Sequence, residues 1–572
     1  MRVLLVHPED SPELAPWSEA SWDLIVDLGW SGTYAYAELS RRLRCEVISL
    51  YGLLDHAVHR DRLRELNSVG LGQIVDSEGI DWWEVYSANL DHTLSQLLMI
   101  AALADRIPVN ADVFTTRAHP ASRTLSILLK REIKVFSNNS PHGPTQGLAK
   151  KLRTLRPSQI LEIAGDKWDT DYQLRRLWTR RHRASTESLV LFPSAYQNVS
   201  RIQIAYARML PERRFILVVT RRNGRIDVPA NVEVRSLAAY APTVAASTEL
   251  ERSDLLRRWE SLKLARLYSH ALLLVGLQEG AFVPFEKLLR DGLRIRDAWN
   301  IVFANEPVAA VLSGDENNEF TRLPSILARS RRIRTLACDH GALNLTLALR
   351  TPCAEIYLAA GEMARDYMVN WCGLEADRVT VGAPDTNQGS NPPLTQQAKD
   401  WIVFFSTPQE IAGGRTQVLY SEILPELCGL AARTKRKVIV KLHPFESRAA
   451  RGALIENLLG APDRALIELR DGPIKSELLE RAWFTITVNS SVAVASTMAQ
   501  VPCFLCDWFD GGWYDYGKQF AKFSAAYPLD SPEQIREIPE RLSRIRISDA
   551  TRNQLQSPMN AARLDSLLFG DQ

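Results

Sequence analysis

The second half of the chain contains the apolar run WIVFF (401–405), the amphipathic stretch TQVLYSEILPELCGLAA (416–432) and a second apolar run, KVIVKL (437–442). Short apolar runs are typical of buried strands, and the longer stretch between them is typical of a helix that covers a sheet. A strand, a helix and a second strand in this order form one unit of a parallel sheet. Residues 401–442 therefore predict an α/β fold.

The same alternation continues on both sides of this unit. Downstream, it predicts strands at 465–469, 484–488 and 503–505, with helices at 474–481 and 493–499. Upstream, it predicts helices at 195–207 and 321–329 and strands at 3–6, 45–50, 113–115, 134–137, 189–192, 214–219, 307–313, 334–338, 355–358 and 378–381. Strands that alternate with helices in this way predict Rossmann-like parallel sheets.

A stretch rich in Gly, Pro, Asn and Ser, APDTNQGSNPP (383–393), divides this alternation in two. Such a composition is typical of a linker. We therefore predict an N-terminal Rossmann-like domain over 1–385, a linker over 386–395 and a C-terminal Rossmann-like domain over 396–530. The two domains would face each other across a cleft, and helices in 531–572 would pack back on them.

One basic segment interrupts the alternation in the N-terminal half, where we predict a helical insertion over about 145–185. Within it, residues 147–183 contain many Lys and Arg side chains, with Trp168 and Trp178 between them. One interpretation is a solvated helical face. The other is an arm that contacts an anionic membrane through Coulomb attraction and partial burial of the aromatic rings.

Composition excludes several classes of protein. The 572 residues have a formal net charge of only +2, whereas nucleic-acid binders usually carry a large basic excess. No apolar run approaches the ~20 residues of a membrane-spanning helix, and the N-terminal MRVLLVH is typical of a strand and not of a signal peptide. Seven cysteines in so long a chain do not indicate a disulfide framework. We therefore expect a cytoplasmic protein that binds no nucleic acid.

Ligands of open parallel sheets bind beyond the carboxyl ends of the strands, so the residues that follow each strand are the candidate site residues. His443 and Pro444 directly follow one apolar run, and Lys441 lies at its end. A His at this edge can donate a hydrogen bond to a phosphate oxygen. The alternative is a loop His bonded to a nearby carbonyl.

Two serines, Ser490 and Ser491, join the strand at 484–488 to the helix at 493–499. Small hydroxyl residues at this position either cap the helix or combine with its free N–H groups to hold an anion. A second, weaker candidate is Arg415, which follows a Gly-Gly pair just before a helix. Together these residues predict a phosphate site in the C-terminal domain.

The N-terminal domain offers candidate bases at the ends of two strands. Asp315 and Glu316 follow the strand at 307–313, and Asp339 and His340 follow the next strand. Adjacent parallel strands would bring all four side chains to one rim, where a carboxylate or imidazole could take a proton from a hydroxyl. The alternative is that Asp315 and Asn317 cap the next helix and that Asp339 and His340 form a turn.

In their order and spacing these motifs resemble those of GT-B glycosyltransferases, and particularly bacterial enzymes that assemble capsule and lipopolysaccharide. In bacterial sialyltransferases and CDP-glycerol transferases, a His-Pro and a Ser-Ser hold the nucleotide and its phosphate. The resemblance assigns these roles to His443-Pro444 and Ser490-Ser491. It implies a donor sugar linked to a nucleotide such as CMP or UDP, and no further cofactor.

The general base of those sialyltransferases is an acid near a glycine. The nearest match is Asp315-Glu316, although Gly314 precedes the acids here and does not follow them. The chain also resembles non-hydrolysing UDP-GlcNAc 2-epimerases, which share the two-domain architecture and a His-Pro. Their Asp-Ser-Gly-Gly turn and paired glutamates are replaced here by Asn489-Ser490-Ser491, so we rank epimerisation second.

We therefore predict a metal-independent glycosyltransferase of surface-polysaccharide synthesis. Asp315, Glu316 or His340 would be the catalytic base. His443, Ser490, Ser491, Arg415 and Lys441 would hold the donor phosphate. The acceptor would be a glycan or a lipid-linked molecule, and residues 147–183 would touch the inner face of the cell membrane. The alternatives are an epimerase and a non-catalytic nucleotide-binding scaffold.

Overall fold

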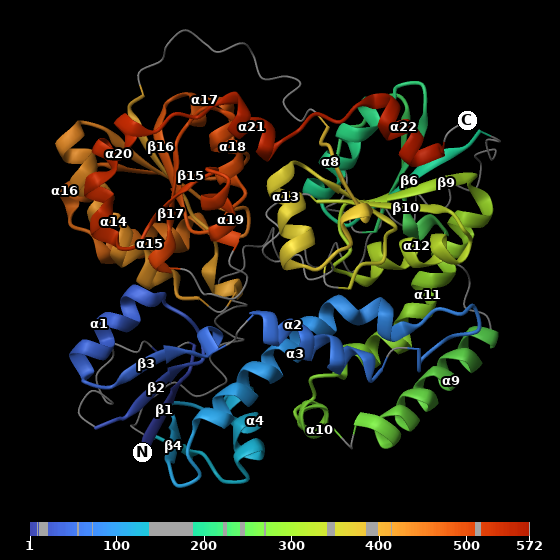
Figure 1. Cartoon of the computed structure of the whole chain (residues 1–572), viewed down its shortest axis with the longest axis horizontal. Coiled ribbons are helices and arrows are strands. Elements are labelled where there is room, and N and C mark those ends of the chain that lie inside the picture. The colour runs from blue at the N-terminus through green and yellow to red at the C-terminus, as the bar shows by residue number, and fades with distance from the viewer. Residues whose placement is uncertain are drawn as a thin grey trace.

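The computed structural model describes residues 1–8, 10, 21–53, 56–70, 72–136, 187–220, 226–240, 246–267, 270–339, 349, 351–384, 399–412, 414–509 and 516–570. Within these residues the strands form three sheets, and every pairing between strands of a sheet is parallel (Figure 1). The α/β class and the Rossmann-like parallel sheets that the sequence predicts are confirmed.

The first sheet, here called the N-terminal sheet, has the strand order β3-β2-β1-β4-β5 among the described residues. Its strands are β1 (Arg2–Val6), β2 (Leu24–Asp27), β3 (Glu46–Ser49), β4 (Asp112–Thr115) and β5 (Lys134–Val135). Strands β1 and β2 are buried almost throughout, as a central strand covered on both faces must be.

The second sheet, the middle sheet, has the order β12-β11-β10-β9-β6-β7-β8. Its strands are β6 (Leu189–Ser194), β7 (Arg214–Val219), β8 (Val232–Ser236), β9 (Val308–Ser313), β10 (Arg334–Cys338), β11 (Ile356–Ala359) and β12 (Val379–Val381). The third, the C-terminal sheet, has the order β15-β14-β13-β16-β17-β18. Its strands are β13 (Trp401–Phe405), β14 (Lys437–Lys441), β15 (Ile467–Arg470), β16 (Ala482–Thr487), β17 (Cys503–Cys506) and β18 (Tyr527–Leu529).

All three sheets repeat one strand order. In each, the first strand lies between the second and the fourth, so the chain reverses its direction of winding next to the first strand. Such a reversal opens a crevice at the carboxyl ends of the first and fourth strands, and ligands of open α/β sheets bind there. The pairs that flank this crevice are β1 and β4, β6 and β9, and β13 and β16.

The structure corrects one feature of the predicted organisation. We expected a single Rossmann-like unit within residues 1–385, but this range contains both the N-terminal and the middle sheet. The residues that join the two sheets in the sequence, 137–186, lie outside the described part of the chain. The linker at 386–395 and the insertion at about 145–185 also lie outside the described residues, so the division into domains stays a prediction.

Helices cover the sheets on their faces. In the N-terminal part and the middle part they are α1 (Thr33–Leu43), α2 (His56–Ser68), α3 (Trp82–Arg106), α4 (Pro120–Leu129), α8 (Gln197–Arg208), α9 (Ala246–Leu262), α10 (Ala271–Gln278), α11 (Val283–Asn305), α12 (Glu319–Ser330) and α13 (Glu362–Asp366). After residue 400 they are α14 (Thr416–Thr434), α15 (Arg448–Leu458), α16 (Ala461–Arg464), α17 (Ser476–Glu480), α18 (Val492–Met498), α19 (Tyr516–Lys522), α20 (Ile538–Arg544), α21 (Asp549–Leu555) and α22 (Ala561–Phe569).

Helix α3 belongs to two hydrophobic cores. It begins at the N-cap Asp81, whose side chain accepts a hydrogen bond from the Trp83 backbone N–H at 3.0 Å. Trp82, Trp83 and Leu94 pack in the core beneath the middle sheet, while Met99 and Leu103 near its other end pack against the N-terminal sheet. Figure 1 shows this helix leading from one sheet to the other. It is about 37 Å long, enough to span a small domain.

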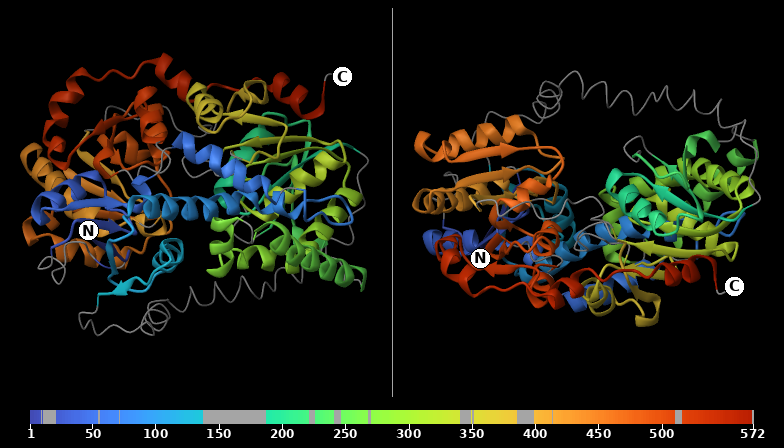
Figure 2. Two further views of the ribbon diagram at one scale, coloured as in Figure 1. Left: turned by 60° about the horizontal axis from the view of Figure 1, so that its bottom comes forward. Right: turned by 90° about the horizontal axis from the view of Figure 1, so that it is seen from above.

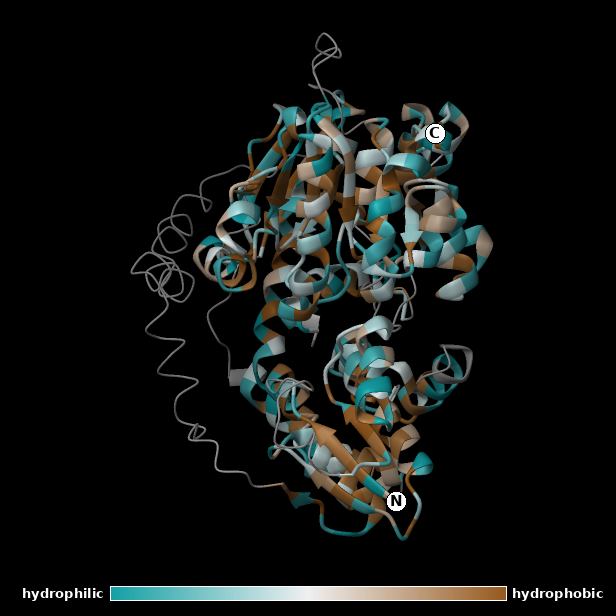
Figure 3. Ribbon diagram, turned by 90° about the vertical axis from the view of Figure 1, so that its left-hand side faces the viewer, coloured by the Kyte–Doolittle hydropathy of each residue, from teal (hydrophilic) through white to brown (hydrophobic). Residues whose placement is uncertain are grey.

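The strands consist largely of apolar residues, which are brown in Figure 3. The middle and C-terminal sheets share one core, in which Tyr357 and Met363 of the middle part lie with Ala493 and Leu505 of the C-terminal part. The chain after residue 530 runs from the C-terminal sheet to the middle sheet, as both views of Figure 2 show. There α21 contacts α13 and α18, and α22 covers β9 and β10.

Candidate functional site

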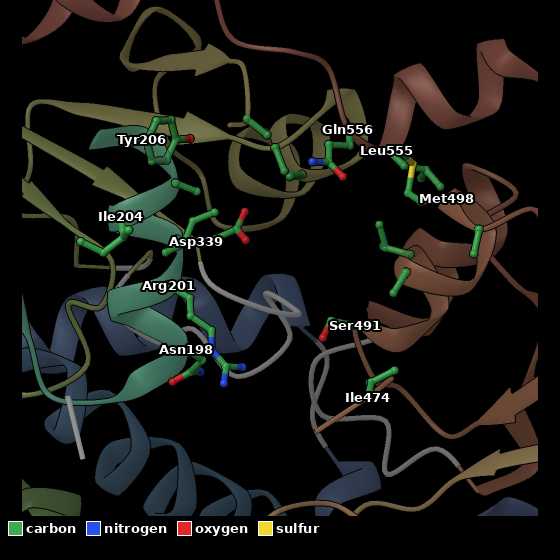
Figure 4. Close-up of a pocket in the computed structure, with 18 of the residues that line it drawn as sticks. Asn198, Arg201, Ile204, Tyr206, Asp339, Ile474, Ser491, Met498, Leu555 and Gln556 are labelled. Carbon is green, nitrogen blue, oxygen red and sulfur yellow. The ribbon is translucent and has the colours of Figure 1, made fainter. Parts of the chain in front are cut away.

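A cleft of about 1350 Å³ lies between the middle and C-terminal sheets. One wall consists of α8, which follows β6, and of residues at the carboxyl ends of β10 and β11. The facing wall consists of α17, α18 and the loop that leads into α18, and Leu555 at the end of α21 and the following Gln556 also line the cleft. Figure 4 shows the side chains of the two walls facing each other across this space.

The middle-sheet wall presents a carboxylate and a guanidinium to the cleft. Asp339 directly follows β10, and Arg201 projects from the second turn of α8 (Figure 4). Tyr206 and Asp339 both line this wall, and burial first of all raises the pKa of Tyr206 well above its ordinary value. The Tyr206 hydroxyl donates to the Gly382 carbonyl at 3.0 Å, so this phenol is a fixed, neutral part of the wall.

The C-terminal wall presents Ser491, which stands at the carboxyl end of β16 just before α18. Its side chain is half-buried and its hydroxyl points toward the middle-sheet wall in Figure 4. Lys475, the exposed N-cap residue of α17, lines the same wall. Ser491 and Lys475 therefore line one wall of the cleft, and Asp339 and Arg201 line the other.

His443 lies at the carboxyl end of β14, as predicted, but it is not among the residues that line this cleft within the described parts of the chain. Strand β13 separates β14 from β16, so His443 and Ser490 are carried by strands about 10 Å apart along the same sheet edge. The structure brings Ser491, but neither His443, Pro444 nor Ser490, to the wall opposite Asp339.

A buried carboxylate holds the His443 loop in place. Glu446 accepts hydrogen bonds from the His443 backbone N–H at 2.8 Å, the Ser406 hydroxyl at 2.7 Å and Arg451 Nε at 2.7 Å. His443 Nδ1 accepts from the Phe445 N–H at 3.2 Å, which leaves Nε2 as the donor of the neutral ring. Burial lowers the pKa of His443, although Glu446 opposes that shift. The imidazole is therefore a neutral donor at pH 7.

Ser490 caps the start of α18 in part, because its Oγ accepts from the Val492 N–H at 3.4 Å. Lys441 is buried, and its ammonium group donates to the Leu442 carbonyl at 2.7 Å. Burial also lowers the pKa of Lys441. The Lys441 ammonium group is therefore bonded to the backbone at the end of its own strand. It does not point toward the predicted phosphate site.

Arg415, predicted to hold phosphate, instead joins the C-terminal part to the N-terminal sheet. Its guanidinium forms a buried ion pair with Asp27, with Nη2 at 2.7 Å from Oδ1, and it donates to the Asp10 carbonyl at 3.1 Å and to the Ser31 hydroxyl at 3.1 Å. The loop before α14 therefore serves as a contact between sheets. The geometry does not favour the phosphate role, which stays a prediction, because Asp27 already compensates this cation inside the protein.

Asp315 and Glu316 also have other roles than the predicted one. Asp315 accepts hydrogen bonds from the Asn317 N–H at 2.9 Å and from Asn318 Nδ2 at 2.7 Å, so it holds the turn before α12, whose N-cap is Asn318. Glu316 is buried and accepts from the Tyr357 hydroxyl at 2.7 Å and the Cys353 thiol at 3.0 Å. Neither side chain lines the cleft among the described residues, so neither is placed to act as base there. His340 lies outside the described residues.

Sequence reasoning missed Arg201 and Lys475. A signal for Arg201 existed, because α8 begins at the carboxyl end of the first strand of its sheet, where ligands bind. No comparable signal marked Lys475. Among the described residues, no group of three or more His, Cys, Asp or Glu side chains is placed to hold a metal ion. A search of the same residues finds no helix with both the length and the apolar character needed to cross a bilayer.

No protein-family model matches the sequence, and no curated protein matches it significantly. Solved structures that match part of the chain include the Neisseria meningitidis UDP-GlcNAc 2-epimerase bound to UDP-GlcNAc, with 10% identity, a TM-score of 0.40 and coverage of 67% of this chain and 96% of that one. The S. aureus MnaA–UDP co-structure has 11% identity and a TM-score of 0.39, and the match covers 65% of this chain and 92% of that one. The spinosyn rhamnosyltransferase SpnG with thymidine diphosphate has 13% identity and a TM-score of 0.34, and the match covers 67% of this chain and 96% of that one.

Proposed function

We propose that this protein is a glycosyltransferase that binds a nucleotide-activated sugar in the cleft between the middle and C-terminal sheets. The observation that carries this proposal is the placement of Asp339 and Ser491 on opposite walls of one cleft of about 1350 Å³. Small-molecule sites commonly measure ~300–1,000 Å³, so this cleft has room for a nucleotide sugar and part of an acceptor.

The donor phosphate would lie against the C-terminal wall. The Ser491 hydroxyl and the Lys475 ammonium group would contact its oxygens, and Arg201 would reach them from the other side. Groups fixed in this way stabilise the negative charge that develops on the leaving phosphate, typically by a few kcal/mol for each donor. Because the chain supplies these cations itself, we propose that transfer needs no divalent metal.

The acceptor hydroxyl would lie beside Asp339. Its carboxylate would take the hydroxyl proton as the oxygen attacks the anomeric carbon and the bond from that carbon to the phosphate oxygen breaks. Asp339 replaces Asp315 and Glu316 in this role, because it alone of the three lines the cleft. His443, at the same sheet edge as Ser491, would meet a more distant part of the nucleotide through Nε2.

The acceptor and the place of the reaction are inferred from the resemblance to bacterial enzymes that assemble capsule and lipopolysaccharide. We propose that the acceptor is a glycan or a lipid-linked precursor of a surface polysaccharide, and that the reaction takes place in the cytoplasm at the inner face of the membrane. Residues 147–183, which lie outside the described residues, would supply the basic membrane contact. Flotation of the protein with vesicles that contain anionic lipid, but not with neutral vesicles, would support this contact.

A thermal-shift screen against CMP-, CDP-, UDP- and GDP-linked sugars tests donor binding, because a ligand of the native state raises Tm by mass action. Nucleotide release that depends on an added acceptor, and that survives EDTA, would then support transfer. Interconversion of the sugar without an acceptor would favour the epimerase, and the absence of any shift would favour a scaffold.

Two carboxylates in the same cleft provide a matched test of the base. We expect Asp339→Asn to lower kcat by about 100-fold or more while the donor still raises Tm. The control is Asp227→Asn, which removes an exposed carboxylate that lines the cleft but has no assigned role. Equal kcat values for the two variants would exclude Asp339 as base. If the donor no longer raises the Tm of Ser491→Ala, that result would support the role of Ser491 in holding the phosphate.

A further inference from the structure

The large cleft has an apolar end in addition to the polar groups described above. Helix α21 contacts both α13 and α18, so the side chains that these three helices turn to the cleft lie close together. Figure 4 shows Leu555 and Met498 next to each other in this region. The apolar end is defined here by the residues that the three helices contribute to the lining, which are Met363, Ala364, Val494, Ala495, Met498 and Leu555.

Part of the apolar end is open to the cleft. Met363 and Leu555 belong to the buried core that the middle and C-terminal parts share. On top of this core, Val494 and Met498 are only half-buried, and Ala495 is exposed. Removing such apolar surface from water is favourable, so the apolar end favours the carbon-rich part of a ligand.

The apolar end lies beyond the groups proposed to hold the donor phosphate. Met498 follows Ser491 by seven residues, which places it ~10 Å farther along α18. A phosphate bound at Ser491 therefore leaves the apolar end to another part of the substrates. The cleft measures about 1350 Å³, more than the ~300–1,000 Å³ of most small-molecule sites, so it has room for that part.

A carbon chain fits the apolar end better than a nucleobase does. Bases carry donors and acceptors on their edges, and binding sites usually meet such groups with polar side chains. The three helices contribute only apolar residues to the lining, and Gln556, which follows Leu555, already donates from Nε2 to the Pro384 carbonyl at 3.2 Å. The position between two facing walls also suits an extended chain better than the convex surface of a folded protein.

We propose that the apolar end binds the carbon chain of an amphipathic acceptor, an alkyl or isoprenoid chain attached to the polar head that carries the reacting hydroxyl. The head would lie beside Asp339, and the chain would run along α18 toward Leu555. The role of this molecule as acceptor rests on the proposed function, whereas binding of its chain can be measured without a donor.

Calorimetric titration of the full chain with butyl, hexyl and octyl β-glucoside, each below its micelle concentration, and with glucose tests the proposal. A buried CH₂ group contributes a constant increment, so we expect Kd to fall by about threefold to fourfold for each added CH₂ until the end is filled. Hydrogen exchange in residues 492–498 should slow when octyl glucoside is bound. A Kd that does not depend on chain length, or no binding of octyl glucoside, would overturn the proposal.

A matched pair of variants distinguishes the apolar end from general stickiness of the surface. Ala495→Glu places a charge at an exposed position of the apolar end, and we expect it to weaken binding of octyl glucoside about tenfold or more. The control is Ala432→Glu, at an exposed position of α14 that is not part of the described lining, and it should bind as the unmodified chain does. Equal affinities of the two variants would mean that the chain binds elsewhere.

A titration in the presence of nucleotide separates this proposal from the proposed function. Octyl glucoside is titrated again with a saturating amount of the nucleotide sugar that raises Tm most, and we expect Kd to change by less than about twofold, because the two ligands occupy different parts of the cleft. A Kd raised about tenfold or more would assign the apolar end to the nucleoside and overturn the proposal. If no nucleotide raises Tm but the dependence on chain length persists, the chain site is supported and the glycosyltransferase is not.

Discussion

At the scale of single residues, Arg415 shows how a local pattern can mislead. A cation that follows Gly-Gly and precedes a helix has the features of a phosphate ligand. Its partner Asp27, however, is 388 residues away along the chain, is fully buried, and also accepts a hydrogen bond from the Tyr36 hydroxyl at 2.9 Å. No spacing rule relates positions so far apart, so only the folded chain reveals this pair.

We expect Arg415→Met to lower the free energy of unfolding by about 3–5 kcal/mol, because it leaves the buried carboxylate of Asp27 without its cation. Urea denaturation measures this loss, and the double variant Asp27→Asn/Arg415→Met should recover part of it. The donor-induced rise in Tm should persist in the single variant. A variant of normal stability that no longer responds to any nucleotide would restore the phosphate role.

His119 makes stability depend on pH. It caps α4 by accepting the Ala121 N–H at Nδ1, 3.1 Å away, and burial, with the nearby charges of His7 and Arg123, lowers its pKa to about 4 from an ordinary value of 6.5. Between pH 6.5 and 4 the unfolded chain holds a proton that the folded chain lacks. This contribution to stability is therefore complete above pH 6.5 and is lost as the pH falls toward 4.

We expect urea denaturation at pH 7 and at pH 4.5 to show a loss of up to about 3 kcal/mol from this histidine. His119→Ser keeps a capping oxygen but cannot be protonated in this range, so it should lose less stability over the same interval. Equal losses in the two proteins would show that other groups cause the pH dependence.

At the scale of elements, the start of α1 is a tight contact between the N-terminal sheet and the C-terminal part. The N-cap residue Gly32 has φ +92°, and a Cβ at this position would stand 2.8 Å from the Phe509 Cα. Next to it the Trp30 ring packs at 4.9 Å from the Phe509 ring, and the Trp30 carbonyl accepts from the Arg415 N–H at 3.0 Å. Only glycine fits both the backbone angle and the space.

We expect Gly32→Ala to lower the free energy of unfolding by about 3 kcal/mol or more. The backbone strain of a non-glycine residue at this φ and the clash of its Cβ with main-chain atoms both destabilise the folded state. Gly79→Ala is the matched control, because Gly79 has φ +80° but open space around its Cα, so about 1–2 kcal/mol is expected there. Thermal denaturation of both variants measures the difference. Equal Tm values would mean that the contact at Gly32 adjusts freely.

Most elements could be predicted from the sequence because central parallel strands, buried on both faces, form continuous apolar runs such as WIVFF in β13. The missed strands lack that pattern. Strand β2 is a four-residue run that ends in the buried Asp27, β8 alternates apolar and charged residues, and β18 contains Pro528 at the edge of its sheet. Of the candidate site residues, Asp339 and Ser491 could be singled out by their position after a strand, and both line the cleft. The partners of Glu316 and Arg415 could not be predicted, because they depend on tertiary packing.

At the scale of the whole molecule, the three sheets contact one another in a closed triangle. Helix α3 joins the cores of the N-terminal and middle sheets, Arg415 and Trp30 join the N-terminal sheet to the C-terminal part, and a shared core joins the C-terminal and middle parts. The walls of the large cleft are therefore fixed by packing from both ends, and each sheet depends on residues outside its own range.

We therefore expect the protein to unfold in one cooperative transition. Scanning calorimetry should give a calorimetric enthalpy close to the van't Hoff enthalpy, since no sheet can lose its core without exposing that of a neighbour. A donor bound in the cleft should raise the single Tm without splitting it. Two or three resolved transitions would show that the contacts between the sheets are weaker than the cores within them.

Helix α22 has a consequence for the order in which the protein is synthesised. Leu564 and Leu568 of this helix are fully buried beside Phe192, Ala310 and Leu312 of the middle sheet. The ribosome completes that sheet at Val381 but makes α22 only after the whole C-terminal sheet has emerged. During that interval the nascent chain displays an uncovered apolar surface, which makes chaperone binding and aggregation compete with its final folding step.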